Sequence, residues 1–184
     1  MDDSETILGE LLVLRCRRGD ASAWRELIGR WERRLFYYVR RLVGCERDAW
    51  DVLQQTWLAA YRAMPSLQEP RALRAWLYRI AHRQAVSHLR RTGAMPDASA
   101  EPLDALADVP DDEIAFPAEA AERVHAGLSK LALAHREVLT LHFLEGMSVA
   151  EIAAVLDVPA GTVKSRLFHA KRALRAAIER GGAS

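Results

Sequence analysis

The chain has 184 residues and a formal net charge of +1, and half of its residues are hydrophobic. This length allows one domain or two small ones, and a near-neutral net charge excludes neither nucleic acid nor protein as a partner. No apolar run approaches the roughly 20 residues that a membrane helix needs, and the acidic N-terminus lacks a secretory signal. We therefore expect a soluble, cytoplasmic chain without membrane insertion.

The first 91 residues contain apolar positions at helical spacing and predict a domain of four helices. The predicted helices cover residues 6–18, 21–43, 46–64 and 72–91. On the first of them, Ile7, Leu11 and Leu14 stand at the spacing of one helix face. A loop bounded by Pro65 and Pro70 separates the third helix from the fourth.

Residues 92–117 differ in composition from both flanking segments. Nine acidic residues and no Lys or Arg lie between Thr92 and Glu122, and Pro and Ala are frequent. This composition predicts a flexible acidic linker. Residues 118–184 form a second predicted domain, with helices over about 118–130 and 134–144 before a final helical pair. The sequence thus predicts an all-α fold of two small helical domains joined by the linker.

The final pair has the pattern of a helix-turn-helix. Ser148 and Glu151 have the spacing of a capping box at the start of a short helix. Asp157 tolerates a left-handed turn, and Pro159 cannot continue the helix before it. A basic second helix follows at once, which is the order found in DNA-binding helix-turn-helix units.

The second helix of the pair separates apolar from cationic residues. Its predicted buried stripe consists of Val163, Leu167, Ala170 and Leu174. Ser165 and Arg172 point the opposite way, flanked by Lys164, Phe168, His169 and Arg175. A solvated basic face is the alternative for this helix alone, and a membrane-surface helix is less favoured because the apolar arc is narrow. With the preceding turn, the pattern favours a helix that enters the major groove of DNA.

The fourth helix gives a weaker signal for nucleic acid. Six arginines and no acidic residue lie between Arg71 and Arg91, interleaved with Trp76 and Tyr78. Aromatic side chains beside cations can stack on unpaired bases while Arg holds the backbone. The same aromatic residues could equally belong to the core of the domain.

Candidate catalytic and metal sites are lacking in the sequence. His82 and His88 stand six apart without an acidic residue between them, which is not a metal motif. Cys16 and Cys45 are isolated, and we expect both to be buried free thiols. We therefore expect no metal, no cofactor and no enzymatic activity.

The order and content of these segments resemble a known family. Three segments of the chain resemble region 2 of bacterial sigma factors. They are GDASAWRELIGRWERRLFYYVRRLVG, DAWDVLQQTWLAAYRAM and RAWLYRIAHRQAVSHLRR. One further segment resembles region 4 of the same family. It is LSKLALAHREVLTLHFLEGMSVAEIAAVLDVPAGTVKSRLFHAKRAL. Because no region 1.1 or region 3 is evident, the chain is similar to the compact extracytoplasmic-function (ECF) group of the sigma-70 family.

The resemblance implies a dissociable subunit that binds bacterial core RNA polymerase and directs promoter recognition and melting, with sigma region 2 at 1–91 and region 4 at 118–184. The implied polymerase-binding residues are Asp48, Asp51, Gln54, Gln55 and Trp57. The implied contacts to the melted −10 strand of promoter DNA are Arg74, Trp76, Tyr78, Arg79, His82, Arg83, His88 and Arg90. The implied contacts to the −35 element are Thr162, Lys164, Ser165, Phe168 and His169, with Arg166, Lys171 and Arg172 near phosphates. The loop Pro65–Arg71 corresponds to the one that captures a flipped base, and an anti-sigma factor is a further candidate partner.

Two positions and one loop depart from the family pattern, and one rival family shares part of it. The loop reads PSLQEPRAL, where the family often has an Arg-Gly stretch. Trp50 stands where an acidic residue is common, and His169 replaces a frequent Arg, which predicts a pH-sensitive DNA contact. The C-terminal segment also resembles the DNA-binding domain of response regulators. That alternative predicts an α/β sensor domain at the N-terminus, whereas the first 90 residues read as all-helical.

Overall fold

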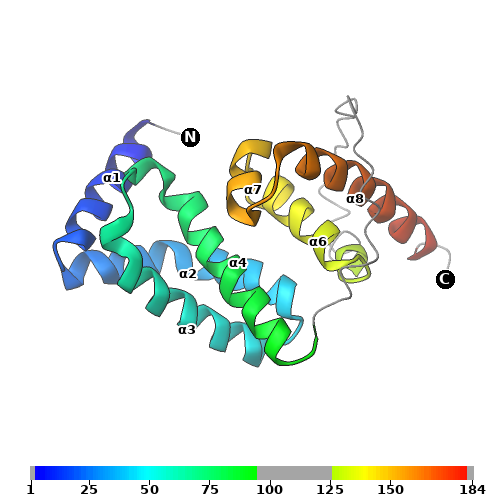
Figure 1. The fold of residues 1–184 in the computed structure, drawn as a ribbon, viewed down its shortest axis with the longest axis horizontal. Helices are drawn as coiled ribbons and strands as arrows, with labels where there is room; N and C mark the ends of the chain where they lie inside the picture. Colours follow the sequence, from blue (N-terminus) through cyan, green and yellow to red (C-terminus); the bar gives the residue numbers. More distant parts are fainter. Residues whose placement is uncertain (1–2, 95–125, 182–184) are drawn as a thin grey trace. The chain divides into compact units, whose positions relative to one another are not determined.

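The computed structural model describes residues 3–94 and 126–181, and within these ranges every regular element is helical. The chain divides into two compact units, with the boundary between Met95 and Pro96 (Figure 1). The predicted all-α class is confirmed. The described part of the first unit has no strand, which contradicts the α/β sensor domain of the rival family.

The first unit is built from four helices with tightly defined ends. They are α1 (Asp3–Arg17), α2 (Ala21–Val43), α3 (Glu46–Ala63) and α4 (Leu73–Arg91). Asp20 caps α2, since its carboxylate accepts the backbone N–H groups of Ser22 at 2.8 Å and Ala23 at 3.2 Å. Gly44 ends α2 in the left-handed region, with φ of 80°. These local signals explain why the bounds predicted for α2 match the structure.

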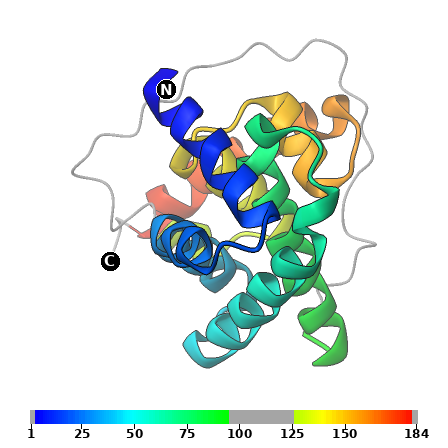
Figure 2. The ribbon, with the colours of Figure 1, turned by 90° about the vertical axis from the view of Figure 1, so that its left-hand side faces the viewer.

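The core of the first unit lies between α2, α3 and α4. In Figure 2, α2 is seen nearly along its axis, and α3 runs beside it. Leu35, Leu53 and Leu77 are buried at the contact of the three helices. Tyr38 and Tyr78 are also fully buried, with ring centroids 5.1 Å apart, so aromatic packing joins α2 to α4.

The buried face of α1 differs from the predicted one. Leu11 is 52% exposed and Leu14 is 42% exposed, whereas Leu12, Val13 and Cys16 are buried. Both sets fit a 3.6-residue period, so spacing could not choose between them. The side chain of Ile7, the third residue of the predicted face, lies outside the described residues.

The two cysteines have different environments. Burial raises the pKa of the Cys16 thiol to about 11. Cys45 is exposed, contrary to the prediction, because it is the residue that caps α3. Its sulfur accepts the backbone N–H of Asp48 at 3.5 Å.

The second unit consists of short helices packed on one long helix. Its elements are a helical turn at 126–129, α6 (Leu133–Leu139), α7 (Val149–Leu156) and α8 (Ala160–Gly181). Where an α-helix was expected to continue to 144, the chain widens into a π-helical segment at Thr140–Leu144. The predicted linker 92–117 and the start of the predicted helix 118–130 lie mostly outside the described residues.

The apolar face of α8 forms one side of the core of the second unit, and the shorter helices form the other. Val163, Leu167, Ala170 and Leu174 are all buried, which confirms the predicted stripe. The 126–129 turn approaches this helix closely at Gly127, where a Cβ would meet Cδ1 of Leu174 at 2.7 Å. A larger residue there would therefore require the Leu174 side chain to shift.

Candidate nucleic-acid interface

The start of α7 is fixed by a capping box. The backbone N–H of Glu151 donates to Ser148 Oγ at 3.3 Å, and the backbone N–H of Ser148 donates to Glu151 Oε2 at 2.9 Å. Reciprocal bonds of this kind satisfy N–H groups that a helix terminus otherwise leaves without an acceptor. The predicted capping box is confirmed, and it sets where the first helix of the pair begins.

The turn between α7 and α8 is equally well defined. Asp157 has a φ of 58° and a ψ of 47°, the left-handed conformation expected of it. The N–H of Val158 reaches back to the carbonyl of Ala153 at 3.2 Å. The left-handed Asp157 therefore ends α7 at Leu156, and α8 starts at Ala160, directly after Pro159. The helix-turn-helix is thus held by its own backbone and by the buried side chains of both helices.

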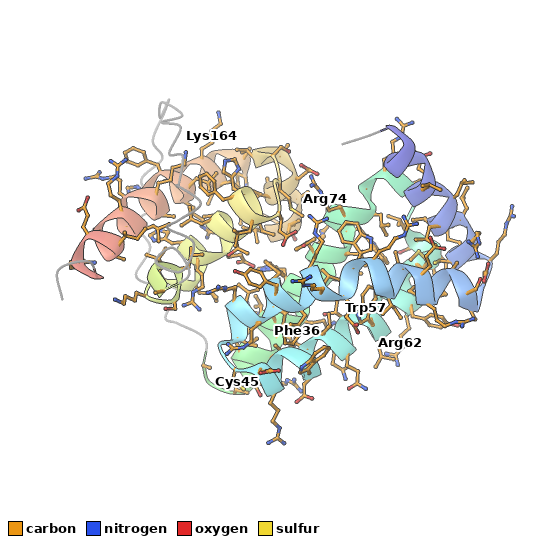
Figure 3. The ribbon with its side chains drawn as sticks, turned by 180° about the vertical axis from the view of Figure 1, so that it is seen from behind. Phe36, Cys45, Trp57, Arg62, Arg74 and Lys164 are labelled. Atoms are coloured by element: carbon orange, nitrogen blue, oxygen red, sulfur yellow. The ribbon has the colours of Figure 1, made fainter. Side chains whose placement is uncertain are left out.

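The solvent side of α8 carries most of the residues predicted to face DNA. Lys164 and Arg172 are exposed, and Lys164 projects away from the body of its unit in Figure 3. The Arg172 guanidinium lies 5.6 Å from the centre of the Phe168 ring, which is a cation–π distance. The remaining predicted side chains on this helix are half-buried: Thr162, Ser165, Arg166, Phe168 and His169.

Two of the predicted α8 contacts are turned inward. Lys171 is only 8% exposed, and its ammonium lies 5.7 Å from the centre of the Phe143 ring. His169 has its Nε2 buried without a hydrogen-bond partner among the described residues. These placements put Lys171 against the π-helical segment and leave Lys164, Arg172 and Arg175 as the exposed cations of the outward face.

The α4 helix divides its predicted strand contacts between surface and core. Arg83 and Arg90 are exposed. Half-buried side chains are those of Arg74, Trp76, Arg79 and His82. Tyr78 is fully buried against α2, and its ring lies edge-on to the Trp31 ring at 6.4 Å. Tyr78 therefore packs in the core between α4 and α2 and does not form part of the α4 surface.

His88, the other buried member of the α4 set, faces α3. The residue is 8% exposed, and its Nε2 lies 3.4 Å from Asp48 Oδ2, at ion-pair distance but without hydrogen-bond geometry. A predicted DNA contact and a predicted polymerase contact are thus brought together inside one unit. The structure therefore links the first turn of α3 to the last turn of α4.

The outer side of α3 presents an acid and two amides beside an apolar cleft. Asp51, Gln54 and Gln55 are exposed, and Asp48 is half-buried. Next to them, a cleft of about 500 Å³ runs between α2 and α3. Its lining includes Trp24, Ile28, Glu32, Trp50, Trp57 and Tyr61.

Trp57 lies in this cleft with an unsatisfied donor. Its indole Nε1 is buried and finds no hydrogen-bond acceptor within the described part of the chain. Figure 3 shows Trp57 at the border of α2 and α3. Buried donors of this kind normally have a partner, so Trp57 Nε1 is an unsatisfied polar atom beneath the wall of the cleft.

The family comparisons match this arrangement of two units. Residues 27–94 match the family described as Sigma-70 region 2, and residues 121–174 match Sigma-70, region 4. The RNA polymerase sigma-H factor of Pseudomonas aeruginosa is 35% identical over 178 residues, covering 91% of this chain and 92% of that protein. The chain belongs to the ECF group of the sigma-70 family.

Further comparisons agree with this assignment. The ECF RNA polymerase sigma-E factor of Escherichia coli K12 is 34% identical over 181 residues, covering 93% of the sigma factor described here and 94% of that protein. The solved structure of CnrH, in complex with the cytosolic domain of CnrY, has a TM-score of 0.68 at 28% identity and covers 93% and 97% of the two chains. As a member of this family, the sigma factor serves the initiation of transcription by bacterial RNA polymerase at promoter DNA.

The loop of the sigma factor between α3 and α4 is anchored from both sides. Two short 3₁₀ turns, Met64–Ser66 and Pro70–Ala72, shape the loop, and Leu67 between them is buried. The Arg71 Nε donates to Glu10 Oε1 on α1 at 2.6 Å, and this bond raises the pKa of Arg71 above its ordinary value. The exposed side chains left at the tip include Gln68 and Glu69.

Two kinds of feature are absent from the described residues of the sigma factor, a metal site and a membrane-spanning helix. Within the described ranges, no three His, Cys, Asp or Glu side chains gather as a metal site. None of the described helices has the length and apolar character that would let it cross a bilayer.

Helical spacing did not reveal the cleft between α2 and α3, although Trp24, Ile28 and Glu32 stand four apart along α2 and give it one continuous edge.

Proposed function

We propose that the two units of this sigma factor contact separate parts of a promoter while α3 binds core RNA polymerase. Region 4 would bind the −35 element through the solvent side of α8, with Lys164, Ser165 and Phe168 at base edges and Arg172 at a phosphate. Region 2 would contact the melted −10 strand through the solvent side of α4. The carrying observation is that both helices turn cationic side chains outward from separate, well-packed units.

The polymerase contact is proposed at the outer side of α3. Exposed Asp51, Gln54 and Gln55 can pair with cationic or amide groups of a partner, as polar groups do at an interface rim. The neighbouring cleft supplies apolar area for a partner. Trp50 stacks on Phe36 with ring centroids 4.3 Å apart, so the position that is commonly acidic adds apolar surface here instead.

The remaining residues of the predicted site would have separate roles in α8, in the loop between α3 and α4, and between α3 and α4. Thr162, Arg166 and His169 are half-buried on α8 and would contact DNA at the border of its reading face. The loop Pro65–Arg71 would capture an unpaired base at its exposed tip. His88 would hold Asp48 and α4 together rather than touch DNA, because its imidazole is buried between α3 and α4.

The proposed setting is the bacterial cytoplasm, and the proposed role is non-enzymatic. Catalysis of RNA synthesis would belong to the polymerase, and the sigma factor would contribute binding energy at the promoter. Since CnrH was solved with the cytosolic domain of CnrY, a regulatory protein that binds this chain and competes with polymerase is a further proposed partner.

Co-elution with purified bacterial core polymerase in size-exclusion chromatography tests the central claim. We expect the wild type to co-elute and Asp51→Arg to lose co-elution. Glu46→Arg is the matched control, because Glu46 is also exposed on α3 and undergoes the same change of charge at a different angle around the helix. A wild type that does not co-elute, or an equal loss in both variants, would contradict the proposed α3 contact.

A further inference from the structure

A row of alternating aromatic and cationic side chains runs along α2, outside the predicted sites. Trp31, Arg34, Tyr37 and Arg41, here called the α2 ladder, recur at three- and four-residue steps and so share one face. The Arg34 guanidinium lies 5.3 Å from the centre of the Trp31 ring, and that of Arg41 lies 5.0 Å from the centre of the Tyr37 ring. Arg41 Nη2 also donates to Tyr37 Oη at 2.9 Å. Each arginine is therefore held beside an aromatic ring.

The α2 ladder borders α4 on the side away from α3. Trp31 meets Tyr78 of α4 edge-on at 6.4 Å, whereas Phe36 meets Trp50 of α3 on another side of the helix. At 1.5 Å per residue, the ladder is about 15 Å long. Through the contact of Trp31 with buried Tyr78, one end of the ladder packs against α4, the helix proposed to contact the melted strand.

The chemistry of the α2 ladder fits an unpaired nucleic-acid strand better than the other partners considered. Guanidinium groups pair with phosphates, and aromatic and guanidinium planes both stack on exposed bases. Duplex DNA offers no base faces to such rings, and an acidic peptide would use the arginines but not the rings. We propose that the α2 ladder binds single-stranded DNA and extends the path of the strand that α4 contacts. This inference rests on the proposed function of region 2.

Fluorescence anisotropy of a labelled oligothymidine of about 20 nucleotides with the full-length protein tests the α2 ladder. Arg34→Ala/Arg41→Ala should weaken binding roughly tenfold at about 50 mM salt, and the slope of log K against log salt should fall by about 1.4 for two lost phosphate contacts. Arg25→Ala/Arg62→Ala is the matched control, since both residues are exposed away from the ladder, Arg25 on the opposite side of α2 and Arg62 on α3. We expect less than a twofold change from it.

Tyr37→Leu separates stacking from charge. It should weaken oligothymidine binding roughly tenfold without changing the salt slope, because no charge is removed. Far-UV circular dichroism of each variant checks that the helices remain folded. Equal effects of the ladder and control pairs would overturn the proposal, as would a wild type that does not bind oligothymidine.

Core-polymerase binding of the same variants distinguishes this inference from the proposed function. We expect both arginine pairs to co-elute with polymerase as the wild type does. If the wild type fails to co-elute, the proposed function fails regardless of DNA binding. If Arg34→Ala/Arg41→Ala keeps oligothymidine binding but loses polymerase, the α2 ladder is a protein contact and the inference alone is overturned.

Discussion

The contact between Gly127 and α8 gives a quantitative test of the packing that holds the DNA-facing helix. A Cβ at this position would lie 2.7 Å from Leu174 Cδ1 and 3.3 Å from Ile178 Cγ1. Leu174 is buried and has little room to move. Overpacking costs about 1–3 kcal/mol, whereas alanine in place of a helical glycine gains about 0.5–1 kcal/mol. We expect Gly127→Ala to lower the free energy of unfolding of the second unit by about 1–2 kcal/mol.

Urea unfolding of the full chain can report the two units separately. All five tryptophans lie in the first unit, so tryptophan fluorescence follows that unit and far-UV circular dichroism follows both. Gly127→Ala should lower the midpoint of the second unit by roughly 1 M urea and leave the fluorescence transition unchanged. Gly161→Ala is the matched control, because a Cβ there meets no atom within 4 Å. If Gly127→Ala proves as stable as the wild type, the reasoning from close packing is refuted.

Three further predictions concern the caps and thiols of the sigma factor. Ellman's reagent at about pH 8 should modify exposed Cys45 in the native chain and reach buried Cys16 only after denaturant is added; equal rates would contradict the burial. Ser148→Ala should lower the stability of the second unit by about 1 kcal/mol in the same urea assay, and Ser148→Asp should restore it. The hydrogen bond from Ser22 holds the pKa of Asp20 well below its ordinary value, so its stabilising effect is present above about pH 4 and is lost as pH falls further. Asp20→Asn, which does not titrate, should reduce the loss of thermal stability at acid pH when unfolding is followed over a pH series. An unchanged loss of stability would count against the cap.

Much of the fold could be predicted because its boundaries are set locally. Asp20 and Gly44 fix the ends of α2, and Ser148 and Asp157 fix those of α7, through groups within a few residues of each terminus. The buried stripe of α8 followed from spacing for the same reason. The predicted face of α1 was wrong because Leu11 and Leu12 both belong to apolar stripes. The positions of α2 and of the loop between α3 and α4 decide which stripe is covered.

The candidate site was less predictable where tertiary neighbours decide the direction of a side chain. A projection of α8 cannot show that Phe143, on a π-helical segment, lies beneath Lys171 and draws its ammonium inward. Likewise, the row of cations on α4 did not reveal that Tyr78 packs on α2 or that His88 faces Asp48. In each case the deciding partner comes from another helix, which periodicity along one helix does not contain.

The burial of Lys171 bears on how the sigma factor gains affinity for DNA. With Lys171 turned inward, the exposed cations of the α8 reading face reduce to a few side chains, and the net charge of the whole chain is only +1. Such charges act within a Debye length of about 10 Å, so each unit alone should bind DNA weakly. If polymerase holds both units at a fixed separation, the second contact becomes intramolecular and gains from a high effective concentration. Specific promoter binding should therefore require the holoenzyme, and a full-length sigma factor that bound promoter duplex as tightly without polymerase would contradict this reasoning.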